Sequence, residues 1–252
     1  MRIGLIGFGK TGSAVARSIL TDPSMSLEWV MRRSELHQFE SVAELADTDI
    51  RSDVFIIPVS AYPISKVLNL YPVDAIIDFS SAKGIMYYGE EAAALGVRIV
   101  SGVSHYPHDI ERKIDQLATT TAVLCSPNIS IGVNVLTFTA ELIRRFSGSA
   151  DVEVIEEHFR TKNGVSSTAA IIANSLGVCE SEVRSVRAGG VISKHEVLFG
   201  YPSQTIRIRH EAVTREAFGE GAIFAAAAMK NLPAGRYCMK DLLLPLFERE
   251  WP

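Results

Sequence analysis

The chain has few cysteines, no long apolar run and no surplus of basic residues. Its three cysteines, Cys125, Cys179 and Cys238, are widely spaced and form no C-x-x-C pattern, which argues against a disulfide framework or a cysteine zinc site and favours a cytoplasmic location. No apolar run reaches the roughly 18 residues that a membrane span needs, so we expect no membrane partner. A formal net charge of -4 argues against nucleic-acid binding.

A metal-binding pattern is also missing from the sequence. His105 and His108 share one loop, but no third ligand stands near them, so we predict no metal site. His195 and His210 alternate with apolar residues and are expected to be structural. Asp78 ends an apolar run and is expected to cap a turn.

Short apolar segments alternate with segments of helical periodicity over the first half of the chain. This order is typical of an α/β fold in which a Rossmann-type, doubly wound parallel sheet carries helices on both faces. Ligands bind such sheets at the carboxyl ends of the strands. The expected strands are residues 1–6, 27–31, 53–58, 75–79, 97–100 and 122–124, and the expected helices are residues 11–20, 89–95 and 109–119.

The pattern changes after Asn128, where we place a domain boundary. Two alternating runs close to each other in the sequence, joined by G-Y-P-S, favour a hairpin-like connection and therefore a mixed sheet. We predict a C-terminal α+β domain. Its expected helices are residues 133–146, 167–176 and 215–230, and its expected strands are residues 152–158, 183–187, 195–199 and 204–210.

The segment G-F-G-K-T-G follows the first expected strand and opens the first expected helix. Gly7 permits the tight turn, Gly9 lets the backbone approach a pyrophosphate, and Gly12 allows close packing of helix on strand. Lys10 and Thr11 begin the helix, whose free N–H groups favour an anion. The motif predicts a dinucleotide site; the alternative is a glycine turn that binds nothing.

The second expected strand ends in Arg32 and Arg33 instead of an acidic residue. Arginines at this place suit the 2′-phosphate of NADPH, whereas a carboxylate would bind the ribose 2′-hydroxyl of NADH. We therefore predict NADPH as the cofactor, with NADH as the alternative. A solvated basic pair is the competing interpretation of the two arginines.

The segment from Ile155 to Ala169 combines proton donors with hydroxyl groups. Alternation predicts that His158, Arg160 and Lys162 share one face of a strand end. An ammonium at Lys162 and an imidazole at His158 suit proton donation to a small anionic substrate. The alternatives are a structural histidine and a solvated surface lysine. The hydroxyl cluster that opens the next helix and could hold a carboxylate consists of Ser166, Ser167 and Thr168.

Four segments together resemble the 4-hydroxy-tetrahydrodipicolinate reductase (dihydrodipicolinate reductase) family of lysine and diaminopimelate biosynthesis. They are S-P-N-I-S-I-G-V-N (Ser126–Asn134), E-E-H-F-R-T-K with S-S-T-A (within Glu156–Ala169), V-R-A-G-G-V-I-S-K-H-E-V-L-F (Val186–Phe199) and T-R-E-A-F-G-E-G-A (Thr214–Ala222). Several ordered motifs at compatible spacing are more specific than any single one.

The resemblance implies a reductase of a small cyclic imine-type dicarboxylate. It implies a dinucleotide-binding domain over residues 1–127, completed by a C-terminal helix at about residues 216–252, and a substrate-binding and oligomerisation domain over residues 128–215. A homotetramer is the expected assembly. His158 and Lys162 fall on the catalytic pair, and Ser166, Ser167 and Thr168 on the loop that grips a carboxylate. The residues implied to flank the cofactor are Phe79, Ser80, Ser101, Gly102, Ser126 and Asn128.

The chain departs from the family pattern on the substrate side. Phe159 stands where the family has a second histidine, Ser167 stands where it has glycine, and the loop before Ser166 is one residue shorter. Ser101–Ser104 replaces a G-T-T-G turn. Two other functions therefore remain open: a reductase of the same fold for another small imine or keto acid, and an NADP-binding protein without catalysis.

Overall fold

The computed structural model describes residues 1–250, and the side chains of residues 1–247. The chain divides into two compact units, one formed by Met1–Ile129 with the chain from Phe218 onward, and the other by Ser130–Ala217. We call them the nucleotide unit and the substrate unit, after the ligands that the sequence predicts for each. Both borders lie within three residues of the borders expected from the sequence, and residues 251 and 252 of the expected C-terminal segment lie outside the described residues.

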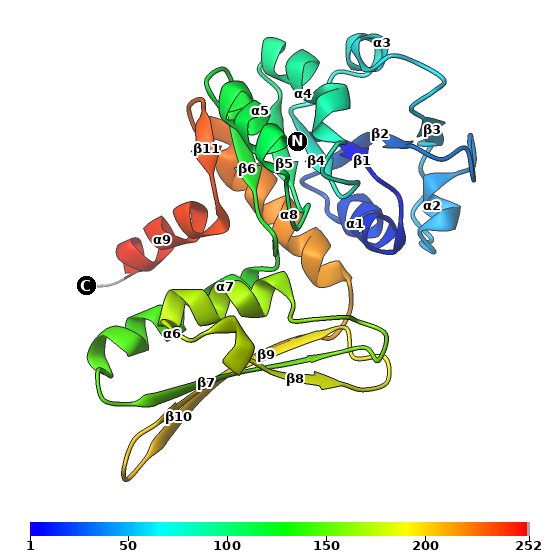
Figure 1. Ribbon diagram of the computed structural model, residues 1–252. Helices are drawn as coiled ribbons and strands as arrows, with labels where there is room; N and C mark the ends of the chain where they lie inside the picture. Colours follow the sequence, from blue (N-terminus) through cyan, green and yellow to red (C-terminus); the bar gives the residue numbers. More distant parts are fainter. Residues whose placement is uncertain (251–252) are drawn as a thin grey trace. The chain divides into compact units, whose positions relative to one another are not determined.

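The nucleotide unit contains a parallel sheet of seven strands in the order β11-β6-β5-β4-β1-β2-β3 (Figure 1). The order reverses between β4 and β1, which is where such sheets bind ligands. The strands are β1 (Arg2–Ile6), β2 (Ser26–Arg32), β3 (Ile56–Pro58), β4 (Ala75–Asp78), β5 (Arg98–Ser101), β6 (Ala122–Cys125) and β11 (Gly235–Tyr237).

Helices lie on both faces of this sheet, which explains why its central strands are mostly apolar and buried. In Figure 1, α3, α4 and α5 group on one face, and α1 and α8 on the other. The core beneath α3, α4 and α5 includes the fully buried Trp29, Ile76 and Tyr88. The helices are α1 (Lys10–Thr21), α2 (Val42–Leu45), α3 (Ile64–Leu70), α4 (Ile85–Ala94), α5 (His108–Ala118), α8 (Glu216–Ala228) and α9 (Met239–Glu250), with a 3₁₀ turn at Met229–Asn231.

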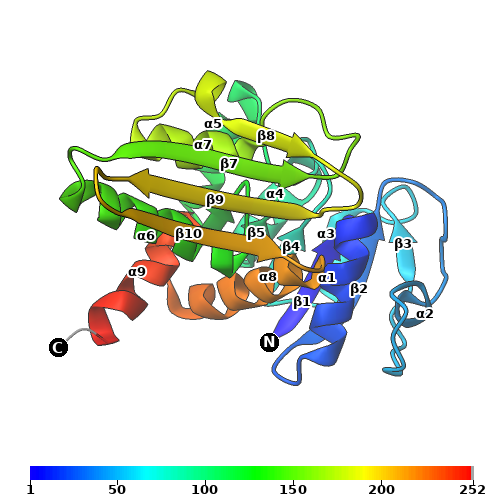
Figure 2. The same ribbon diagram turned by 90° about the horizontal axis from the view of Figure 1, so that it is seen from below.

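The substrate unit is a sheet of four strands in the order β10-β9-β7-β8, with α6 and α7 packed on one face (Figure 2). Strands β7 and β8 pair parallel, whereas β7 and β10 pair antiparallel with β9, so the sheet is mixed as predicted. Its elements are α6 (Ile131–Phe146), β7 (Asp151–His158), α7 (Ser167–Leu176), a 3₁₀ turn (Glu180–Glu182), β8 (Arg184–Arg187), β9 (Ser193–Gly200) and β10 (Thr205–Ala212).

The fold class is confirmed, but the end of the chain differs from the expectation. The helix expected over residues 215–230 is present as α8, but the C-terminal helix expected over about residues 216–252 is instead α8, the strand β11 and then α9. Leu232 and Pro233 follow the 3₁₀ turn, and a proline resists continuation of a helix. The strand β11 has only three residues, including a glycine, and its place is decided by parallel pairing with β6. The short helices α2 and α3 were also missed.

Candidate functional site

The turn after β1 is shaped by two glycines that admit no side chain. Gly7 has a φ of +94°, and a Cβ there would lie 2.7 Å from the backbone of Phe79. A Cβ on Gly12 would lie 2.1 Å from the carbonyl oxygen of Gly7. The first glycine therefore permits the turn, and the third permits helix α1 to pack on it.

Gly9 differs from both, because a Cβ built on it meets nothing within 4 Å. It is the N-cap residue of α1, and no side chain caps that helix end. The first turn of α1 holds Lys10, Thr11 and Gly12 and no acidic residue. Free N–H groups and the positive end of the helix dipole thus lie beside open space, as an anion-binding site requires.

A cavity of about 450 Å³ adjoins this turn in the nucleotide unit. Six of the predicted cofactor residues line it: Gly7, Gly9, Arg32, Arg33, Phe79 and Ser80. Val59, Ser81, Lys83, Gly84 and Tyr87 also line it, and no sequence motif had pointed to them. Its volume suits a cofactor-sized ligand.

Three cations surround this cavity: Arg32 at the end of β2, the exposed Arg33 beside it, and the exposed Lys83. In the described part of the chain, none of the three side chains has a hydrogen bond or ion pair with another residue. Their charges are therefore available to a phosphate group of a ligand.

The other predicted cofactor residues do not line the cavity. Ser101 and Gly102 lie at the end of β5, and a Cβ on Gly102 would lie 2.5 Å from the Phe79 ring. Ser126 donates from its hydroxyl to the carbonyl oxygen of Asn128 at 2.7 Å. These four residues occupy the carboxyl edge of β5 and β6, next to the cavity in strand order.

A row of polar groups supports this edge, because Asp78, Ser101 and Cys125 pair in register at the ends of β4, β5 and β6. Asp78 accepts hydrogen bonds from the Ser80 amide at 2.7 Å and the Tyr88 hydroxyl at 2.8 Å, so the expected turn cap is confirmed. Burial raises the pKa of the Asp78 carboxyl, although both hydrogen bonds oppose the shift. Burial also raises the pKa of the Cys125 thiol to about 12, which keeps it protonated and unreactive.

In the substrate unit, β7 ends at His158, which corrects one sequence prediction. Arg160 and Lys162 do not continue the strand, so the three side chains do not share a strand face. The backbone turns because the Lys162 amide donates to the Phe159 carbonyl at 3.1 Å, and Gly164 then adopts a φ of +61°. The alternating polar pattern is the same in a strand and in this turn, so sequence periodicity could not separate them.

The turn leads into the N-terminus of α7, as predicted from the hydroxyl cluster. The Ser166 hydroxyl accepts from the Ala169 amide at 3.1 Å and caps the helix. Ser167 is exposed and Thr168 is buried. Phe159 is 37% exposed at the opposite end of the turn, and Lys162 is half-buried between them. We call residues 159–168 the substrate segment.

A fully buried carboxylate, Glu156, lies beneath the substrate segment and was missed by motif reasoning. Its two oxygens accept from the Ser166 amide at 3.3 and 3.1 Å, and one of them also accepts from Arg187 Nη2 at 2.6 Å and from the Ser185 hydroxyl at 2.7 Å. Burial raises the pKa of Glu156, but the polar groups around it outweigh this effect and hold the pKa well below its ordinary value.

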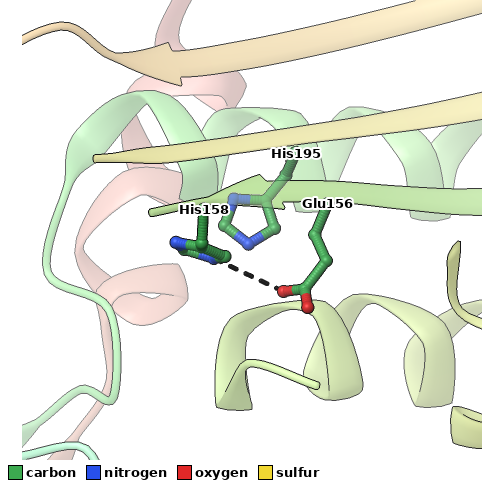
Figure 3. A group of neighbouring side chains, drawn as sticks. All are labelled: Glu156, His158 and His195. Carbon is green, nitrogen blue, oxygen red and sulfur yellow. Dashed lines mark ion pairs between the residues drawn. The ribbon is translucent and has the colours of Figure 1, made fainter. Parts of the chain in front are cut away.

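Two histidines complete this cluster (Figure 3). His158 Nδ1 donates to the Ile192 carbonyl oxygen at 2.9 Å, and its buried Nε2 faces Glu156 Oε2 at 3.4 Å without making a hydrogen bond. His195 Nε2 and the Ser166 hydroxyl are 3.2 Å apart, and the two imidazole rings meet edge to face. Burial lowers the pKa of His195 to about 3, so this ring is neutral. Its structural role agrees with the expectation.

Glu156, His158 and His195 present ligand atoms within 4.8 Å of one another, the spacing of a metal site. The surrounding charges argue for a different role. The guanidinium of Arg187 already holds Glu156 at 2.6 Å, and Ser166 engages His195. A divalent cation would be repelled by that guanidinium, so we interpret the cluster as a hydrogen-bonded charge network.

Four features of the nucleotide unit fit a nicotinamide nucleotide. They are the open space at Gly9, the N-terminus of α1 without a side-chain cap, the cavity, and the cations that line it. The second unit carries a half-buried lysine in the turn that precedes helix α7. A protein with these two units is an oxidoreductase that acts with NAD(P)H on a small molecule.

Comparison with known proteins specifies the family. Residues 1–129 match the family model described as "Dihydrodipicolinate reductase, N-terminus", and residues 132–243 match "Dihydrodipicolinate reductase, C-terminus". The chain belongs to the dihydrodipicolinate reductase family, which confirms the resemblance inferred from the four sequence segments.

Individual relatives agree with the family match. A 4-hydroxy-tetrahydrodipicolinate reductase of Anaeromyxobacter dehalogenans (strain 2CP-C) is 27% identical over 261 residues, covering 93% of this chain and 94% of the relative. One from Alkaliphilus metalliredigens (strain QYMF) is 32% identical over 192 residues, covering 68% and 80%. Among solved structures, the dipicolinate-bound dihydrodipicolinate reductase from Paenisporosarcina sp. TG-14 has a TM-score of 0.79 and 19% identity, covering 96% and 98%, and shares the fold.

No helix in the described part of the chain has the length and apolar character needed to cross a membrane.

Proposed function

We propose that this protein reduces 4-hydroxy-tetrahydrodipicolinate, a small cyclic imine-type dicarboxylate, with NADPH in the lysine (diaminopimelate) pathway of the cytoplasm. The observation that carries the proposal is the substrate segment, where Lys162 precedes a helix N-terminus that is opened by three hydroxyl residues. This arrangement suits a substrate that needs both a proton and a carboxylate contact. The names of the relatives point to the same substrate.

Lys162 is the proposed proton donor. Its side chain is half-buried and has no hydrogen bond or ion pair with another residue in the described part of the chain. An ammonium in that position can donate a proton to the substrate as negative charge develops during reduction. Ser166, Ser167, Thr168 and the backbone N–H groups that open α7 are proposed to hold a substrate carboxylate.

His158 is the second proposed catalytic residue. Since the Ile192 carbonyl oxygen can only accept, Nδ1 carries a proton, and a further proton on Nε2 would make an imidazolium that faces Glu156. That charge beside the substrate segment would stabilise an anionic substrate. Phe159 takes the place of a polar contact and is proposed to pack against the apolar part of the substrate.

The nucleotide unit is proposed to bind NADPH in preference to NADH. Gly9 and the first turn of α1, formed by Lys10, Thr11 and Gly12, would receive the pyrophosphate, and Arg32 with Arg33 would receive the 2′-phosphate. When bound, the reduced nicotinamide supplies the hydride. The proposed neighbours of the nicotinamide half are Phe79, Ser80, Ser101, Gly102, Ser126 and Asn128.

A homotetramer is the proposed assembly. Among the described residues of this unit, no helix covers the face of the β10-β9-β7-β8 sheet opposite α6 and α7 (Figure 2). That face carries charged pairs, including Arg207 with Glu196 and Arg209 with Glu211. Self-complementary charge of this kind suits pairing of two copies through their sheets. Sedimentation equilibrium tests the proposal, and a monomer would contradict it.

The decisive experiment for the function is NADPH oxidation, followed by the loss of nicotinamide absorbance, with freshly prepared 4-hydroxy-tetrahydrodipicolinate and a panel of other cyclic imines and keto acids. Turnover of the pathway substrate supports the proposal. Turnover of another compound alone would favour a same-fold reductase with a different substrate, which Phe159 and Ser167 make worth testing. Nucleotide binding without any turnover would favour a non-catalytic role.

A further inference from the structure

The backbone of the substrate segment accepts hydrogen bonds from one arginine side chain. Arg187, at the end of β8, donates from Nε to the Lys162 carbonyl oxygen at 3.0 Å and from Nη2 to the Gly164 carbonyl oxygen. The same Nη2 donates to Glu156. A planar guanidinium can engage several acceptors at fixed angles, so its position dictates the path of the turn that carries Lys162.

The carboxylate at the other end of this pair holds the next part of the segment. Glu156 is fully buried and accepts from the Ser166 amide, which begins the N-terminal cap of α7. It also faces His158 Nε2 at 3.4 Å. One ion pair therefore contacts the backbone on both sides of Val165 and one of the two proposed catalytic side chains.

A second arginine–glutamate pair on the same two strands differs from this one in how far its side chains are exposed. Arg184 and Glu153 form a bidentate pair at 2.7 and 3.2 Å across β8 and β7, but their side chains are 68% and 39% exposed. The side chains of Arg187 and Glu156 are 18% and 0% exposed. An exposed pair contributes little to stability, whereas a buried pair must offset a large desolvation cost.

A buried ion pair is often no more stabilising than apolar residues of similar size, so stability alone does not explain this one. Its hydrogen bonds instead end on the backbone of the substrate segment, at Lys162, Gly164 and Ser166. The ion pair therefore acts on the conformation of this turn, whose backbone is also tied to the rest of the unit by the hydrogen bond from the Arg160 amide to the Gly189 carbonyl oxygen.

We propose that Glu156 and Arg187 are positioning residues that hold the substrate segment in the conformation that presents Lys162 and the N-terminus of α7 to the substrate. The inference rests on the proposed function for the identity of the substrate. It assigns a role to two residues that do not themselves contact the reacting atoms. A displacement of about 1 Å in such a segment is enough to reduce turnover by about 10²-fold.

Three variants test the proposal. Arg187→Met leaves the Glu156 charge buried and unpaired, so it should lower both thermal stability and activity. The double variant Glu156→Gln with Arg187→Met removes both charges and should recover most of the stability. Arg184→Met removes the exposed arginine from the same strand and serves as the matched control.

The expected result for the double variant is a loss of about 10- to 10²-fold in kcat/KM for the dicarboxylate substrate, mostly through KM, with the Kd for NADPH within about twofold of the parent. Arg184→Met should keep kcat/KM within about twofold, with its oligomer mass measured alongside. The proposal is overturned if the double variant regains kcat/KM together with stability, or if the control loses as much activity.

Two measurements do not depend on turnover and separate this inference from the proposed function. Hydrogen exchange at the Arg160 and Lys162 amides should be about tenfold faster in the double variant and unchanged in Arg184→Met. Calorimetry with dipicolinate and oxidised nucleotide should show binding weakened about tenfold. If the parent protein turns over no pathway substrate, the proposed function fails, while unchanged exchange in the double variant would still refute the positioning role.

Discussion

The two units form their candidate sites from different parts of the chain, mainly backbone in one and buried side chains in the other. In the nucleotide unit, the site is formed mainly by backbone, namely a glycine turn and a helix end without a side-chain cap. They adjoin a cavity of about 450 Å³ that is lined by cations without partners among the described residues. In the substrate unit, the site rests on buried side chains, with Glu156 at the centre accepting hydrogen bonds from Ser166, Ser185 and Arg187. The first site should therefore be sensitive to added atoms, and the second to lost charges and hydrogen bonds.

The largest effect is expected from Lys162, the proposed proton donor of the substrate unit. Lys162→Ala should lower kcat by about 10²–10⁴-fold if this ammonium donates the proton as proposed, with the Kd for NADPH little changed. Steady-state kinetics with fluorescence titration of the nucleotide measure both quantities. Arg145→Ala, which removes an exposed cation at the end of α6 outside the substrate segment, is the control. A collapse of NADPH binding in Lys162→Ala would show that the two sites are not separable in this way.

The glycine turn offers the complementary test in the nucleotide unit. Gly9→Ala adds a methyl group where nothing lies within 4 Å, so the fold should be kept while the Kd for NADPH rises by about 10–10²-fold through a clash with the pyrophosphate. Calorimetric titration and thermal melting measure the two effects. Gly148→Ala, whose Cβ also meets nothing, should change neither.

Gly12→Ala should act differently from Gly9→Ala, because its Cβ would lie 2.1 Å from the Gly7 carbonyl oxygen. We expect a loss of about 1–3 kcal/mol in unfolding free energy together with weaker nucleotide binding. Denaturant unfolding measures the first quantity. Equal stability of the two glycine variants would contradict the assignment of packing to Gly12 and ligand approach to Gly9.

The cations around the cavity are proposed to select NADPH over NADH. Arg32→Asp should weaken NADPH by about 10–10²-fold, since a charge-assisted bond to the 2′-phosphate is replaced by repulsion, and should leave NADH nearly unchanged. Separate titrations with the two nucleotides measure the ratio, and Lys230→Asp, an exposed cation that does not line this cavity, is the control. An equal loss for both nucleotides would remove Arg32 from cofactor selection.

The last test concerns how the unfolding free energy of the substrate unit depends on pH. Burial, with the nearby His158, lowers the pKa of His195 in the folded protein to about 3, against about 6.5 when unfolded. The unfolded chain binds the additional proton between these values, so this stability is present above about pH 6.5 and is lost as the pH falls towards 3.

Between pH 7 and pH 5 the loss from His195 should be about 2 kcal/mol. His210, whose pKa is also lowered by burial, adds in the same direction. Urea unfolding across this range measures the slope, and His195→Gln should flatten it. A slope that is identical in the parent and the variant would show that His195 is not the residue responsible.

Much of this molecule follows from the chain's local patterns. Two sequence features indicated the two units: the glycine spacing at Gly7, Gly9 and Gly12, and the change in hydrophobic pattern near Asn128. The hydroxyl cluster at Ser166 indicated the start of α7. These features are local, since a turn, a strand period or a helix cap is encoded within a few residues.

Only the tertiary structure decided where Lys162 lies and what Glu156 and Arg187 do. Arg187 stands 25 residues after Lys162 and 31 after Glu156, and no sequence period relates them. The parallel pairing of β7 with β8 brings Arg187 beside His158, and burial then turns an ordinary carboxylate and guanidinium into a fixed support. Desolvation and strand pairing depend on residues far apart in the chain, so the sequence specifies the chemical groups, and the fold determines which of them act together.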